Sequence, residues 1–233
     1  MAGRSPGAVA GVLFDLDGTL ADTPGAIAAI TGGILSERGL DVPAAEVLAG
    51  VGKPLDQNFA AWFGRPADHP DVRQALSAYR EQFGRHVRAT GPRLLYPGVA
   101  EGLAALAGAG LLLGITTSKI QLAGEQLVAL TGIADHFAVV AGHDTTPHGK
   151  PSPDMALFAA DRLGLAPADC VVVGDSVADV AMGRAAGMTV FGVSYGVATA
   201  ADLTAAGAAL VVDSFPDLVP AVAAATAGRT VTG

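Results

Sequence analysis

Two carboxylates near the start of the chain stand where an apolar segment ends. Asp15 and Asp17 directly follow residues 8–14, and Gly18 comes next. The segment 8–14 is short, apolar and partly β-branched, which predicts a buried strand. Side chains two positions apart in an extended chain point to the same side, so both carboxylates can converge on one ligand. At the carboxyl end of a parallel strand, such a pair is suited to metal binding, nucleophilic attack or proton transfer.

Hydroxyl and ammonium groups follow a second apolar run. Thr117, Ser118 and Lys119 come directly after residues 111–116, which also have the pattern of a buried strand. Ser118 could simply cap the next helix. Alternatively, the Thr117 hydroxyl and the Ser118 N–H could donate to a phosphoryl oxygen, as groups at a helix N-terminus do.

A lysine and two more carboxylates complete this set. Lys150 lies in a Gly-Lys-Pro-Ser-Pro context that is not a phosphate-binding Walker loop, because Pro151 stands where a Ser or Thr is needed. Asp175 follows the apolar run 170–174, and Asp179 lies four residues further on. Acidic residues are common at the start of a helix because they interact favourably with the helix dipole. Asp175 and Asp179 therefore indicate a functional site only in combination with the buried strand before them.

The elements that must position these groups alternate between strand and helix after residue 96. This pattern predicts an α/β fold, a doubly wound parallel sheet with a Rossmann-like core and the first strand in its centre. Residues 23–95 have helical periodicity and predict an inserted helical cap, which leaves residues 1–22 and 96–233 for the core. The cap includes a helix over 69–87. The predicted strands are 8–14, 111–116, 137–141, 170–174, 189–193 and 209–212, and the predicted core helices are 99–108, 121–130, 153–163, 177–186 and one starting near Pro216.

Composition narrows the classes of function. The net charge of −8 argues against partners such as nucleic acid and anionic membranes. Apolar runs fall short of the roughly 18 residues of a membrane span, and the N-terminal apolar segment lacks a signal cleavage site, so we expect a cytoplasmic protein. The single Cys170 is expected to be a buried hydrophobe, and residues 1–7 and 228–233 are expected to be frayed ends. The sequence leaves monomer and homodimer open.

The stretch from Phe14 to Leu20, followed by Asp22-Thr23, closely resembles the first motif of the haloacid dehalogenase superfamily, in its phosphoglycolate phosphatase and β-phosphoglucomutase-like branch. The second, third and fourth motifs of that superfamily match Thr117-Ser118, the Gly-Lys-Pro-Ser-Pro stretch and Gly-Asp175-x-x-x-Asp179. Ser118 is a mild departure, because related phosphatases often have Asn there. The resemblance covers the whole chain and is least specific in the cap.

The resemblance implies a Mg²⁺-dependent phosphatase that forms an aspartyl phosphate on a small phosphorylated metabolite. It assigns catalysis to Asp15, Asp17, Thr117 and Lys150, substrate binding to Gly18, Thr19 and Ser118, and the metal to Asp15, Asp17 (through its main-chain carbonyl), Asp175 and Asp179. Four aspartates set against one lysine need a divalent cation, and oxygen ligands suit Mg²⁺. The five histidines lie outside metal-motif spacing, which disfavours Zn²⁺.

Several alternatives stay open. Asp17 argues against halide-releasing dehalogenases and phosphonatases of this superfamily, which lack this second aspartate. A phosphosugar mutase would share both aspartates but return phosphate to the sugar, and a phospho-accepting signalling module would keep its aspartyl phosphate for hours. In the cap, we expect Lys53 in the loop 50–54 to reach the substrate, with Arg65 and Arg93 as weaker candidates. The substrate could be phosphoglycolate, a sugar phosphate, a nucleotide or pyrophosphate.

Overall fold

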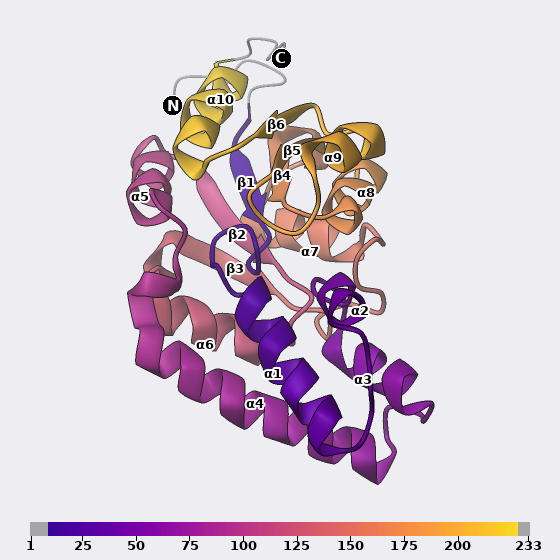
Figure 1. Ribbon diagram of the computed structural model, residues 1–233. Coiled ribbons are helices and arrows are strands. Elements are labelled where there is room, and N and C mark those ends of the chain that lie inside the picture. Colours follow the sequence, from indigo (N-terminus) through magenta and orange to yellow (C-terminus); the bar gives the residue numbers. More distant parts are fainter. Residues whose placement is uncertain (1–8, 228–233) are drawn as a thin grey trace.

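A computed structural model describes residues 9–227 as a six-stranded sheet with helices around it (Figure 1). All neighbouring strands pair in parallel, in the order β3-β2-β1-β4-β5-β6, so the first strand lies in the centre as predicted. The strands are β1 (Gly11–Phe14), β2 (Leu112–Thr116), β3 (Phe137–Ala141), β4 (Cys170–Gly174), β5 (Thr189–Val193) and β6 (Leu210–Val212). The doubly wound α/β fold is therefore confirmed.

The helices fall into two sets along the chain. The first four follow one another after β1: α1 (Pro24–Glu37), α2 (Ala44–Ala49), α3 (Leu55–Phe63) and α4 (Pro70–Thr90). The others alternate with the remaining strands: α5 (Val99–Gly108), α6 (Gln121–Thr131), α7 (Asp154–Leu163), α8 (Val177–Ala185), α9 (Ala200–Ala206) and α10 (Phe215–Thr226). Short 3₁₀ turns occupy Gly91–Leu94, Ala134–His136 and Pro167–Asp169.

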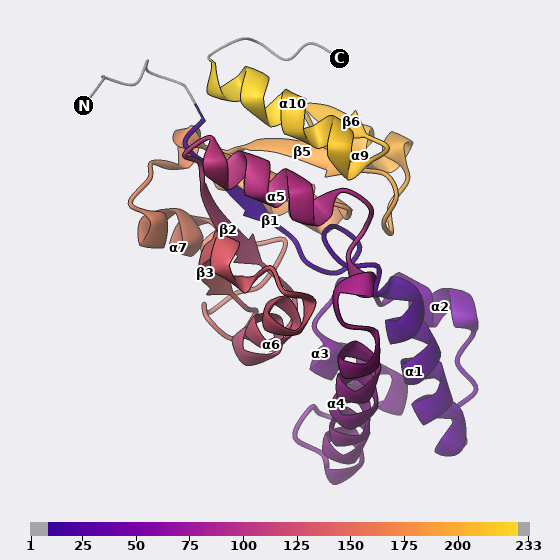
Figure 2. The same cartoon turned by 90° about the vertical axis from the view of Figure 1, so that its left-hand side faces the viewer.

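Each face of the sheet has its own hydrophobic cluster, because successive side chains of a strand point to opposite faces. Phe14 packs on the side of α5 and α10, where its ring lies 5.9 Å from that of Phe215. Leu13 packs on the opposite side, with Met155 of α7 and Met182 of α8. Figure 2 shows α5 and α10 lying together over one face of the sheet. The central strand is thus buried on both faces, which explains its continuous apolar run.

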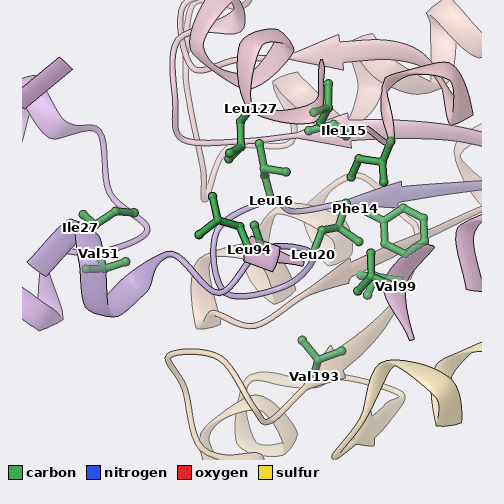
Figure 3. Packing of buried hydrophobic residues seen from close by; sticks show 14 of the residues in the cluster. Phe14, Leu16, Leu20, Ile27, Val51, Leu94, Val99, Ile115, Leu127 and Val193 are labelled. Carbon is green, nitrogen blue, oxygen red and sulfur yellow. The ribbon is translucent and has the colours of Figure 1, made fainter. Parts of the chain in front are cut away.

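Helices α1–α4, which we call the helical layer, lie beyond the carboxyl ends of the strands (Figures 1 and 2). Helix α4 packs against α1 and α3, and its contacts with α6 connect the layer to the core. Figure 3 shows Ile27 and Val51 of the layer close together, on the opposite side of Leu16 and Leu20 from Phe14. Division of the chain into a cap at 23–95 and a core stays a prediction.

Some predicted boundaries differ from the structure. Strand β1 begins at Gly11, and residue 8 and the predicted frayed ends lie outside the described residues. The sequence did not separately predict α2, α3 and α9, which are six, nine and seven residues long. The helices of six and seven residues contain too few turns to give a clear apolar period. Thr199 and Asp202 form a side-chain cap at the start of α9, and that spacing could have revealed it.

Between residues 9 and 227, no helix is long and apolar enough to cross a membrane.

Candidate active site

Strand register brings the polar stretches to one edge of the sheet. Phe14 is the last residue of β1 and pairs with Ile115 on one side and Val173 on the other. The residues that follow these three positions therefore leave the sheet at the same level. Asp15 comes after β1, Thr117 after β2 and Asp175 after β4, as expected for a ligand site at the carboxyl ends of parallel strands.

Three of these carboxylates form one buried cluster. Oxygens of Asp15, Asp175 and Asp179 lie within 4.8 Å of one another, and all three residues are buried. Burial, together with the neighbouring carboxylates, raises the pKa of Asp15 well above its usual value. Burial and Asp179 raise the pKa of Asp175 to about 7. This excess of buried negative charge, on oxygen donors alone, fits a hard divalent cation such as Mg²⁺.

Lys150 provides positive charge inside this cluster. Its Nζ lies 2.5 Å from both Asp15 Oδ1 and Asp179 Oδ1, and its side chain is only 3% exposed. Burial alone would lower the pKa of Lys150, but the two carboxylates outweigh this effect and raise it. Lys150 is therefore a fixed cation beside Asp15, and three carboxylates against this one ammonium leave a net negative cluster.

Asp175 is held by groups from two distant loops. Its Oδ1 accepts from the Thr19 hydroxyl at 3.0 Å, and its Oδ2 accepts from the Val197 N–H at 2.7 Å. Gly18 has φ +85°, and a Cβ at this position would lie 2.2 Å from Asp175 Oδ2. A side chain there would displace the carboxylate, so Gly18 and Thr19 position Asp175 in this structure. Tyr195 supports the same loop by donating to the Thr19 carbonyl at 2.7 Å.

Asp179 is fixed at the start of α8. Ser176 and Asp179 form a capping box, in which Asp179 Oδ2 accepts from the Ser176 N–H at 3.1 Å and from its hydroxyl at 2.5 Å. The other oxygen, Oδ1, faces Lys150. Gly174 leaves the space for this arrangement, because a Cβ there would lie 2.3 Å from Asp179 Cγ.

The Asp17 side chain has its partners outside this cluster. Its Oδ1 accepts from the Thr23 hydroxyl at 2.5 Å, and its Oδ2 lies 3.0 Å from Lys119 Nζ. Lys119 Nζ also lies 4.3 Å from the centroid of the Phe83 ring in α4, a cation–π contact. The two aspartates of the first motif thus have different partners, one in the carboxylate cluster and one beside the helical layer.

The remaining predicted residues differ in how close they lie to the site. Thr117 is buried, and its hydroxyl accepts from the Lys119 N–H at 3.2 Å. The Ser118 hydroxyl donates to the Gly52 carbonyl of the helical layer at 2.6 Å. Lys53 is exposed at the edge of a cavity next to the site. Arg65 and Arg93 are exposed and do not line this cavity, and Arg93 donates to the Ala89 carbonyl at the end of α4.

That cavity, of about 480 Å³, lies between the helical layer and α6. Of the four aspartates predicted for the site, Asp17 is the one that lines this cavity. Its walls come from α4 and α6, with further residues from α1, α3 and the loop 50–53. A ligand held at the carboxylate cluster could therefore extend past Asp17 into the layer.

Three partners of the site were not assigned from the sequence: Thr23, Lys119 and Tyr195. Thr23 belongs to the first motif, and Lys119 and Tyr195 both follow the carboxyl ends of strands. Their positions in the sequence could therefore have indicated that they belong to the site. Cys170, by contrast, is fully buried as predicted, and burial raises the pKa of its thiol to about 11. A thiol in this environment is not a nucleophile at neutral pH.

Known proteins are similar to this chain over most of its length. The haloacid dehalogenase-like hydrolase family matches residues 12–193. A protein of Dickeya dadantii described as "Probable phosphatase IndB" is 38% identical over 213 residues, which cover 90% of this chain and 92% of that protein. A phosphoglycolate phosphatase of Thiobacillus denitrificans is 33% identical over 190 residues, which cover 79% of this chain and 83% of that protein.

A solved structure shows that the similarity includes the fold. A haloacid dehalogenase family hydrolase of Deinococcus radiodurans, described with bound phosphate and sodium, has a TM-score of 0.73 and 30% identity, and the match covers 97% of this chain and 100% of that one. The chain therefore belongs to the haloacid dehalogenase-like hydrolase family.

Proposed function

We propose that the protein is a Mg²⁺-dependent phosphatase that releases inorganic phosphate from a small phosphorylated metabolite through an aspartyl phosphate on Asp15. The observation that carries this proposal is the different environment of the two aspartates. Asp15 lies beside Lys150 in the carboxylate cluster, whereas Asp17 lies outside it with Lys119. One carboxylate is thus suited to attack phosphorus and the other to move protons.

In the first step, a carboxylate oxygen of Asp15 attacks phosphorus, and the bond from phosphorus to the leaving oxygen breaks. Protonated Asp17 gives its proton to that oxygen, so the product leaves as a neutral alcohol. In the second step, Asp17 takes a proton from water while the water oxygen attacks the aspartyl phosphate. The bond between Asp15 and phosphorus breaks, which releases inorganic phosphate and restores both aspartates to their starting forms.

Positive charge near Asp15 is needed for an anionic phosphate to approach. Lys150 faces the phosphoryl oxygens, and Thr117 donates a hydrogen bond to one of them. Asp15, Asp175, Asp179 and the main-chain carbonyl of Asp17 would hold Mg²⁺, which when bound supplies further positive charge to the transferring group. The relative from Deinococcus radiodurans, described with bound phosphate and sodium, supports phosphate and a cation as ligands of such a site.

Residues 23–95 act as a cap that selects the substrate and excludes water. The hydrogen bond from Ser118 to Gly52 and the contact of Lys119 with Phe83 support this role, because both join the helical layer to residues next to the site.

Phosphate release tests the proposal directly. The purified protein, assayed on a panel of phosphomonoesters, should release inorganic phosphate with Mg²⁺ and lose this activity in excess EDTA. Asp15→Asn should lower the activity at least about 10³-fold, whereas Asp22→Asn, an exposed aspartate of the same loop, should retain it. Appreciable activity in Asp15→Asn would show that Asp15 is not the nucleophile. Phosphate returned to a second hydroxyl of a sugar would instead identify a mutase.

A further inference from the structure

We propose that the alcohol released from the substrate carries a planar, mainly apolar ring with a hydrogen-bonding group, and that this ring binds in the cavity between the helical layer and α6. The inference rests on the proposed phosphatase function, because it names the class of leaving group. It is carried by the position, size and lining of the cavity.

The position of the cavity assigns it to the leaving group. Asp17 lines it, whereas Asp15, Lys150 and Asp175 do not. In the proposed reaction Asp17 protonates the oxygen that leaves phosphorus, so this oxygen lies next to Asp17. The rest of the leaving group then extends from Asp17 into the cavity.

The size of the cavity favours a ring over a short chain. Its volume of about 480 Å³ is within the range of about 300–1,000 Å³ found for small-molecule sites. A two-carbon leaving group such as glycolate would contact only the walls next to Asp17. Most of the cavity would remain filled with water against apolar side chains, which is unfavourable for binding.

The walls are mainly aromatic and aliphatic. Tyr79 and Phe83 lie next to each other on α4, with ring centroids 5.4 Å apart and planes at 9°, and Trp62 of α3 lines the same space. Ile27 of α1 and Leu76 of α4 add aliphatic surface. Such walls bind flat apolar groups through buried area and ring contacts.

One buried hydroxyl in the walls has no partner. Thr31 of α1 is 1% exposed and lines the cavity, and its Oγ1 makes no hydrogen bond within residues 9–227. A buried threonine elsewhere shows the usual alternative: Thr131 of α6 donates to the Leu127 carbonyl of its own helix. Because an unpaired buried polar group is costly, Thr31 marks the position of a hydrogen-bonding group on the ligand.

The cations of the cavity do not form a buried carboxylate site. Lys53, Arg80 and Arg88 line the cavity but are exposed. Two further basic residues of the lining have acidic partners: Lys119 is paired with Asp17, and His143 Nε2 lies 3.7 Å from Asp56 Oδ1. A small anionic leaving group such as glycolate would therefore meet charge only at the solvent-facing rim. The lining favours a ring with a polar substituent over a short carboxylate.

Binding to the Asp15→Asn protein tests the inference without requiring turnover. The ligands are uridine 5′-monophosphate and benzyl phosphate, which carry a planar ring and are called the ring-bearing esters, and two others without a planar ring. These are ribose 5-phosphate, whose furanose ring is puckered, and phosphoglycolate, which has no ring. Calorimetry gives the dissociation constants, and fluorescence of Trp62, the single tryptophan of the chain, reports occupancy of the cavity. We expect at least one ring-bearing ester to bind at least about tenfold more tightly than both others and to change Trp62 fluorescence.

Thr31→Val in the same background tests the hydrogen bond. The substitution should weaken the binding of uridine 5′-monophosphate by up to about tenfold. The affinity for benzyl phosphate, whose ring has no hydrogen-bonding group, should stay unchanged. Thr131→Val is the matched control and should change neither affinity.

Equal or weaker binding of both ring-bearing esters would overturn the inference, and hydrolysis by the wild-type protein would then leave the proposed function intact. Conversely, tight binding of a ring without hydrolysis of any ester by the wild-type protein would refute the proposed function and retain the ring site.

Discussion

Lys119 Nζ lies 3.0 Å from Asp17 Oδ2 and 4.3 Å from the centre of the Phe83 ring. The pair is largely buried, with side-chain exposures of 12% and 11%. Phe83 belongs to α4 of the helical layer, whereas Asp17 and Lys119 follow core strands. The orientation of the proposed proton donor is therefore linked to the position of the layer through one lysine.

Replacement of this lysine should impair proton transfer more than attack on phosphorus. Lys119→Met removes the partner that orients Asp17, so we expect kcat to fall about 10²-fold on alkyl phosphates, whose leaving oxygen needs a proton. On p-nitrophenyl phosphate, whose leaving group departs without one, kcat should fall by less than about fivefold. Steady-state kinetics on both esters measure the difference, and Arg85→Met, at an exposed position of α4 that does not line the cavity, is the control. An equal loss on both esters would show that Lys119 does not act through Asp17.

Gly18→Ala should disturb the Asp175 carboxylate. The new Cβ would lie 2.2 Å from Asp175 Oδ2, so the carboxylate must move, and the residue must also adopt φ +85°. Activity should fall at least about tenfold, and the Mg²⁺ concentration for half-maximal activity should rise. Gly39→Ala is a matched control because Gly39 has φ +72° but no atom within 4 Å of an added Cβ. It should cost about 1–2 kcal/mol of stability and leave the Mg²⁺ requirement unchanged.

The metal-free protein should lose stability as pH rises. Asp175 has a folded-state pKa raised to about 7, whereas in the unfolded chain it is near 4. Between these values the folded state binds the additional proton, so the free energy of unfolding falls with increasing pH, by an amount on the order of 3 kcal/mol from this group. Denaturant titrations in EDTA between pH 4.5 and pH 8 measure this slope.

Two comparisons identify the source of that slope. Asp175→Asn should reduce it, because the titrating group is gone. Saturating Mg²⁺ should restore stability of the wild-type protein at pH 8 and have little effect on the variant, since binding to the folded state adds to its stability. A slope that is the same in both proteins would contradict the assignment.

Ser118→Ala should loosen the connection between the core and the helical layer. The Ser118 hydroxyl donates to the Gly52 carbonyl at 2.6 Å, next to Lys53 in the loop that lines the cavity. We expect a several-fold higher KM and a kcat within about twofold of the wild type, because the hydrogen bond positions the loop and does not touch phosphorus. Ser77→Ala, an exposed serine of α4, should change neither constant.

The order of apolar and polar segments along the chain specifies the class of fold and the edge of the sheet at which the polar stretches lie. Segments such as Cys170–Gly174 are apolar throughout because they are buried on both faces of the sheet, and the residue after such a strand must emerge at the carboxyl edge. The local pattern therefore placed Asp15 and Asp175 at the same edge of the sheet, and the resemblance to the family assigned them to one site.

The partners of these groups depend on how the helices and loops pack together in three dimensions. Whether Asp17 faces the carboxylate cluster or Lys119 depends on a side-chain rotation, and the contact of Lys119 with Phe83 requires α4 to pack near the end of β2, far away in sequence. The cavity and the unpaired hydroxyl of Thr31 likewise arise where α1, α3, α4 and α6 meet. A periodic apolar pattern shows that a helix face is buried, but its period carries no information on which element covers that face or where a space remains.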